Sequence, residues 1–108
     1  MIDWNRVAAL REEVGAEDFD EVVELFLQEV DEEIETLTKT RDGLAEKLHF
    51  LKGSALSLGF SEFSSLCQSG ETSLSADPMA QVDLPGIQAM YQSSRTAFLT
   101  DLPAKFGS

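Results

Sequence analysis

Residues 44–59 read LAEKLHFLKGSALSLG and decide the fold of this 108-residue chain. Apolar residues in this stretch recur at steps of four, three, four and three, at Leu44, Leu48, Leu51, Ala55 and Leu58. That spacing is typical of an α-helix with one buried face, and it predicts a helix over residues 41–58. Gly59 follows the last apolar position and suits a left-handed helix cap, with Phe60 folding back on the last turn.

The other segments show the same helical periodicity, and no run of alternating β-branched residues predicts a strand. We expect helices over residues 4–14, 18–38 and 61–75, the last with Ser61 as its N-cap. A final helix should begin after Asp83, have Pro85 in its first turn, and fray after Pro103. The two- or three-residue turn at Gly59 makes the helices on either side antiparallel neighbours. The sequence therefore predicts a single all-α domain over residues 1–108, an antiparallel four-helix bundle with a short additional N-terminal helix.

Composition and charge narrow the classes of function. The formal net charge of −12 argues against binding to nucleic acid or to anionic membranes, because both would repel such a surface. No segment approaches the roughly 18 apolar residues of a membrane helix, and the first residues lack the pattern of a signal peptide. The single cysteine, Cys67, agrees with a reducing compartment. We expect a cytoplasmic monomer.

Cofactor and metal sites have no support in the sequence. One histidine and one cysteine without ligand spacing do not make a metal site. No glycine-rich phosphate loop follows a strand, so nucleotide binding is not expected either. Four large side chains are instead expected to pack in the core or at its edge: Trp4, Met79, Met90 and Tyr91.

His49 is the only histidine of the chain, and it lies one residue off the apolar stripe, outside the buried arc of its helix. Lys52 follows at i+3, where its ammonium can approach a group on the imidazole. Gly53 follows at i+4 on the same ridge, where we expect any side chain to crowd the ring. A neutral imidazole is a nucleophile near pH 7, and attack on phosphorus gives a phosphoramidate. These residues predict a phosphorylatable histidine; the alternative is an ordinary solvated surface histidine.

Basic residues gather around this position on an otherwise acidic chain. Half of the eight basic residues fall within a 14-residue window: Lys39, Arg41, Lys47 and Lys52. A local basic island suits phosphate or a partner with an acidic pocket, although such residues also commonly decorate helix surfaces. The residues expected to contact a partner lie on the ridge of His49 or on the outward side of its helix: Asp42, Ala45, Phe50, Gly53, Leu56 and Ser57. For Phe50, cover by the first helix is the alternative.

The motif H-x-L-K-G-S-A-x-x-L-G, at residues 49–59, resembles that of the histidine phosphotransfer (HPt) domain family of multistep phosphorelays. The resemblance implies a four-helix bundle that exposes the imidazole for phosphorylation on Nε2, with no ATP site of its own. It also implies docking of response-regulator receiver domains around the histidine. The family usually offers Gln or Glu from the fourth helix to Nδ1, and that register falls on Glu71, with Gln68 one turn earlier.

Three hypotheses of function follow. In the first, a stand-alone carrier accepts a phosphoryl group on His49 from a receiver-domain aspartate and passes it to another receiver, without turnover of its own. In the second, the chain is the phosphoacceptor module of a chemotaxis-type or hybrid histidine kinase. A glutamate rather than a glutamine at position 71 slightly favours this hypothesis. In the third, from another class, the chain is an acidic helical adaptor with no phosphotransfer role.

Overall fold

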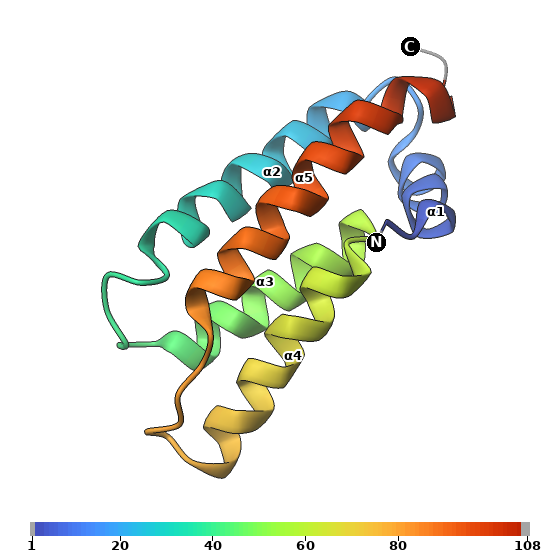
Figure 1. Ribbon diagram of the computed structural model, residues 1–108. Helices are drawn as coiled ribbons and strands as arrows, with labels where there is room; N and C mark the ends of the chain where they lie inside the picture. The colour runs from blue at the N-terminus through green and yellow to red at the C-terminus, as the bar shows by residue number, and fades with distance from the viewer. Residues whose placement is uncertain (1, 107–108) are drawn as a thin grey trace.

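The computed structural model describes residues 2–106 and consists of helices joined by short loops (Figure 1). Within these residues there is no strand, and only an isolated bridge pairs Ile2 with Phe60. None of the helices in this part of the chain has the length and apolar character needed to cross a membrane. The all-α class is therefore confirmed. The described part of the chain contains five helices: α1 (Trp4–Val14), α2 (Phe19–Thr36), α3 (Leu44–Leu58), α4 (Ser61–Ala76) and α5 (Leu84–Phe106).

The ends of the helices follow local backbone chemistry. α1 has the predicted bounds: the Asp3 side chain accepts from the Arg6 N–H at its start, and Gly15 ends it at φ 89°. α3 begins three residues later than predicted, because Gly43 adopts the left-handed conformation at φ 68°. Arg41, expected in that helix, lies in the preceding loop and donates to the Pro78 and Ala80 carbonyls.

The turn between α3 and α4 contains the predicted left-handed glycine. Gly59 has φ 77°, and a Cβ added there would lie 2.6 Å from the Asp3 carbonyl oxygen. Both the backbone conformation and the lack of space for a side chain therefore require glycine at this position. Phe60 is fully buried behind the turn. The expectation that Ser61 is the N-cap is wrong by one residue, because Ser61 is already the first residue of α4 and Phe60 occupies the cap position.

The core contains every residue of the apolar stripe predicted for α3. Burial of one such leucine side chain contributes about 1.5–3 kcal/mol to stability, so the stripe sets which face of α3 points inward. Polar contacts add to the packing between α2 and α5, where Asp31 accepts from both the Tyr91 hydroxyl and the Arg95 guanidinium. The opposite side of α3, which carries His49, therefore faces outward.

Two expectations about the periphery are wrong. α5 does not fray after Pro103 but continues to Phe106, whose ring packs against Trp4 and Phe19 at centroid distances of 6.3 and 5.6 Å. This aromatic cluster brings together both ends of the described chain, which helical periodicity alone does not reveal. Met79, expected to pack, is 75% exposed.

The pairing of α3 with α4 positions the site. α4 returns along α3 in the opposite direction (Figure 1). His49 lies 11 residues before Phe60, and Glu71 lies 11 residues after it. Because both helices rise about 1.5 Å per residue, these two positions come level with each other across the pair.

Candidate functional site

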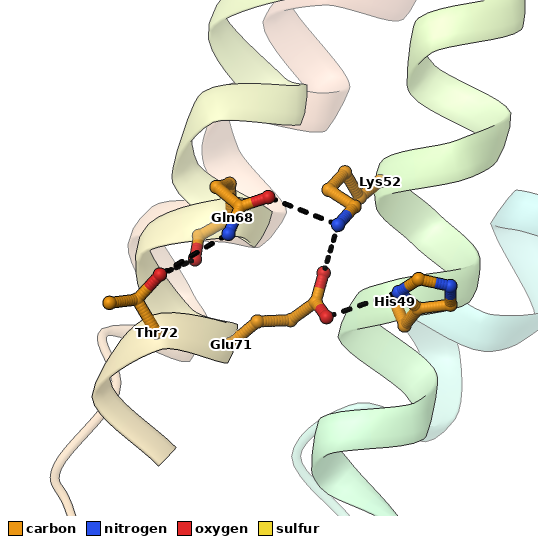
Figure 2. A network of polar contacts seen from close by, with 5 residues as sticks. All are labelled: His49, Lys52, Gln68, Glu71 and Thr72. Carbon is orange, nitrogen blue, oxygen red and sulfur yellow. Dashed lines mark hydrogen bonds and ion pairs between the residues drawn. The ribbon is translucent and has the colours of Figure 1, made fainter. Parts of the chain in front are cut away.

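The His49 side chain stands on the outer surface of α3 and is 71% exposed. Its Nδ1 atom lies 3.1 Å from Oε2 of Glu71, which projects from α4. Figure 2 shows the second ring nitrogen on the side away from Glu71. One nitrogen is thus held by the protein and the other faces outward.

The second oxygen of the Glu71 carboxylate is also engaged. Oε1 lies 3.1 Å from Nζ of Lys52, one turn along α3 from His49. The same ammonium donates to Oε1 of Gln68 at 3.0 Å, so Gln68 contacts the lysine and not the imidazole (Figure 2). The Gln68 amide in turn donates to the Thr72 hydroxyl at 3.2 Å. The carboxylate therefore bridges the imidazole and the ammonium.

The charge state of Glu71 follows from these contacts. Partial burial acts to raise the pKa of its carboxyl, since only 19% of the side chain is exposed. The hydrogen bonds from Lys52 and His49 act in the opposite direction and prevail, so the pKa of Glu71 lies below its usual range. The group is a carboxylate near neutral pH.

An ionised carboxylate determines which tautomer of the imidazole is present. Because a carboxylate can only accept hydrogen bonds, the proton of a neutral His49 ring must be on Nδ1. Nε2 then carries the free lone pair, and it is the nitrogen on the exposed side of the ring. The arrangement can therefore present a nucleophile to a group arriving from solvent while a fixed negative charge stands behind the ring.

The surface around the imidazole is open. Among the described residues, a Cβ built on Gly53 would lie within 4 Å of no atom outside its chain neighbours and the backbone of its own helix, so the expectation that any side chain there would crowd the ring is wrong for a methyl group. Two large apolar side chains of α3 are exposed, Leu56 at 56% and Phe50 at 38%. Of the other residues predicted to contact a partner, Asp42 and Ala45 are exposed and Ser57 is half-buried.

Thr72 is the member of this network that the sequence did not point to. Its hydroxyl accepts from the Gln68 side chain and donates to the Gln68 carbonyl oxygen at 3.0 Å. A glutamine and a threonine four residues apart on one helix were the only available signal. Among residues 2–106, no group of three or more His, Cys, Asp or Glu side chains is arranged to hold a metal ion.

The described residues thus form an all-helical domain with an exposed histidine that is held through one ring nitrogen. The family model described as Hpt domain matches residues 21–97, well over half of the chain and including His49, Lys52, Gln68 and Glu71. The chain therefore belongs to the Hpt domain family. Comparisons with curated proteins and with solved structures found no match.

Membership of the family defines the general biochemistry. Hpt domains carry out histidine phosphotransfer in phosphorelays and are phosphocarrier modules without an ATP site of their own. Their partners are receiver domains and kinases. A phosphocarrier needs an accessible nucleophile rather than a cleft, because in-line phosphoryl transfer depends mainly on positioning and charge stabilisation that a partner can supply.

Proposed function

We propose that this protein accepts a phosphoryl group on His49 from a receiver-domain aspartate and passes it to the aspartate of another receiver. The observation that carries the proposal is the asymmetry of the imidazole: Nδ1 is 3.1 Å from a carboxylate, whereas the ring as a whole is 71% exposed. The family supports phosphotransfer in general, and the transfer between two receivers is our proposal.

The chemistry balances without a group from elsewhere in the chain. The Nε2 lone pair attacks the phosphorus of the aspartyl phosphate, a P–N bond forms, and the P–O bond to the aspartate breaks with release of its carboxylate. The proton stays on Nδ1, so the phosphorylated ring is cationic. Glu71, 3.1 Å away, stabilises that charge. Attack by a second aspartate on phosphorus reverses the sequence and regenerates the neutral imidazole.

Lys52 has a supporting electrostatic role in this proposal. Its ammonium lies 3.1 Å from Glu71 and its side chain is 20% exposed, so it keeps the carboxylate ionised and adds positive potential beside the incoming phosphate. Gln68 holds the ammonium from its other side at 3.0 Å. Gln68 therefore acts on the imidazole only through Lys52 and Glu71.

We further propose that α2 to α5 form the antiparallel four-helix bundle of the family, with α1 as an additional helix and the chain as one domain over residues 1–108. The domain would work as a cytoplasmic monomer. Its receiver-docking surface would surround His49 and comprise the exposed or half-buried residues Asp42, Ala45, Phe50, Gly53, Leu56 and Ser57. The bare backbone at Gly53 would allow close approach of the receiver, because no side chain of another element in residues 2–106 lies within 4 Å of a Cβ placed there.

Transfer from a radiolabelled phosphoreceiver tests the proposal. The wild-type protein should become labelled and should then pass the label to a second, unphosphorylated receiver. His49→Gln should acquire no label, while its circular dichroism remains that of the wild type because His49 is exposed. Full labelling of His49→Gln would refute the proposal. Binding of receivers without any transfer from the wild-type protein would favour an adaptor.

A further inference from the structure

A hollow of about 340 Å³ lies at the end of the α3–α4 pair, beside the loop that precedes α3 and the loop that follows α4. Apolar groups make up much of its lining, and acidic side chains stand at its edge. The lining includes Leu44, Ala45, Leu74, Pro78 and Met79, with Asp42 and Glu46 among the charged residues. Two of these, Asp42 and Ala45, belong to the docking surface proposed above.

The loop that carries Met79 is held in place by several hydrogen bonds. The Asp77 carboxylate accepts from the Met79 N–H at 3.0 Å, and the Asp77 carbonyl accepts from the Ala80 N–H at 2.9 Å. Arg41 reaches across from the other loop and donates to the carbonyls of Pro78 and Ala80 at 3.2 and 3.0 Å. The turn is thus tied at both sides of Met79.

This turn holds a large apolar side chain in water. Met79 is 75% exposed, the highest value for any large apolar residue in residues 2–106. A flexible thioether can adapt to differently shaped partner surfaces, which is why methionine is common at binding surfaces. Together with the apolar side chains that line the hollow, Met79 offers a partner an apolar surface that binding would bury.

The position of the hollow along the helices places it near His49. Ala45 lies one turn before His49 on α3, about 6 Å along the axis, and Leu74 lies about 4.5 Å beyond Glu71 on α4. A standard interface covers about 800 Å² on each partner, equivalent to a disc of about 16 Å radius. A docking surface of this size centred on His49 would extend along the helix axes as far as Ala45 and Leu74, which line the hollow.

We propose that this hollow and Met79 are the part of the docking surface that selects among receiver domains. The preferred receiver places an apolar side chain in the hollow against Met79, and a basic side chain against the exposed carboxylates of Asp42 and Glu46. Arg41 is engaged with backbone carbonyls and holds the shape of the site. This inference rests on the proposed function, because it assumes that His49 exchanges its phosphoryl group with receivers.

The test compares transfer to a panel of receivers with labelling by phosphoramidate, a small donor that needs no docking surface. For each variant, the rate of transfer to each receiver is divided by the rate of phosphoramidate labelling. Met79→Asp should lower this ratio at least about tenfold for the receivers that the wild type prefers. Asp42→Lys should lower it for receivers with a basic side chain at the contact and change their order of preference. Leu25→Asp, on α2 and 53% exposed, is the matched control and should leave all ratios unchanged.

The outcomes separate the two proposals. The ratio of transfer to phosphoramidate labelling could stay within twofold of the wild type for Met79→Asp and Asp42→Lys with every receiver. This result would overturn the selecting role of the hollow and leave the function of His49 intact. Absence of transfer from the wild-type protein to every receiver would overturn the proposed function and this inference together. A loss confined to transfer from a kinase, with receivers unaffected, would also overturn the inference, because the hollow would then serve a different partner.

Discussion

Oε2 of Glu71 on α4 lies 3.1 Å from Nδ1 of His49 on α3, and the other oxygen of the same carboxylate lies 3.1 Å from Lys52. One side chain thus fixes the imidazole tautomer and is itself kept ionised by a lysine one helical turn from the histidine. Within residues 2–106 the structure gives the other ring nitrogen no hydrogen-bond partner, and this nitrogen lies on the side of the ring away from Glu71 (Figure 2). The contact of Nδ1 with the carboxylate therefore leaves Nε2 as the nitrogen that can react.

Removal of the Glu71 carboxylate should slow phosphotransfer. In Glu71→Ala the ring loses both its orientation and the negative charge that stabilises the phosphorylated imidazole, so the transfer rate should fall about tenfold or more. Glu71→Gln keeps an acceptor for Nδ1–H but no charge, and should give an intermediate rate. Stopped-flow transfer with a phosphoreceiver measures both. Equal rates for Glu71→Ala and the wild type would show that the contact has no role in transfer.

The ionised carboxylate of Glu71 should also make stability depend on pH. The pKa of Glu71 is lowered in the folded protein from an ordinary value of 4.5. The contribution of Glu71 to the free energy of unfolding is therefore fully present above about pH 4.5, and it is lost as the pH falls through the lowered pKa. Urea unfolding can be measured from pH 7 to pH 3. The free energy of unfolding of the wild type should exceed that of Glu71→Gln, and this difference should shrink in the acidic range. A difference that stays constant or grows on acidification would contradict the sign of the shift.

Gly53→Ala should separate stability from transfer. The added methyl group meets no side chain of the described residues within 4 Å, so it should stabilise α3 by about 0.5–1 kcal/mol through better helix propensity. Transfer to receivers should slow roughly tenfold, because the methyl group keeps the partner's backbone away. Ser65→Ala, on an exposed position of α4, is the control for helix propensity and should leave transfer unchanged. Faster or equal transfer by Gly53→Ala would mean that no partner approaches there.

The thiol of Cys67 should be unreactive in the folded protein. Burial, followed by the negative charge of Glu71, raises the pKa of this thiol to about 12, and the side chain is fully buried. At pH 8 the thiolate fraction is then about three orders of magnitude below that of a free cysteine. Iodoacetamide should label the protein in 6 M urea and not in buffer, as mass spectrometry can measure. Rapid labelling of the native protein would place Cys67 outside the core.

The helices could be predicted from the sequence because each buries a continuous apolar stripe, as Leu48 and Leu51 do in α3. The ends were harder to predict where tertiary contacts decide them. α3 starts late because Gly43 takes the left-handed conformation, and Arg41 before it binds the carbonyls of Pro78 and Ala80 instead of joining the helix. α5 extends past Pro103 because Phe106 joins a cluster with Trp4. Neither contact can be inferred from the helix propensity of the local sequence.

The same distinction holds for the site. The approach of Glu71 to His49 matches the register that the family resemblance implied, because it depends only on where two antiparallel helices turn. The link from Lys52 to Gln68 was not foreseen, since it depends on the spacing of α3 and α4 and on side-chain rotamers. The exposure of Met79 likewise follows from the tied turn after α4 and not from its own hydrophobicity.

The central claim is that Nε2 of His49 receives the phosphoryl group while Nδ1 keeps its proton against Glu71. Nitrogen-15 NMR of the histidine ring, recorded before and after transfer from a phosphoreceiver, tests it most directly. We predict one phosphorylated residue, with phosphorus coupled to Nε2 and a proton retained on Nδ1. Phosphorus on Nδ1, or on any residue other than His49, would contradict the account.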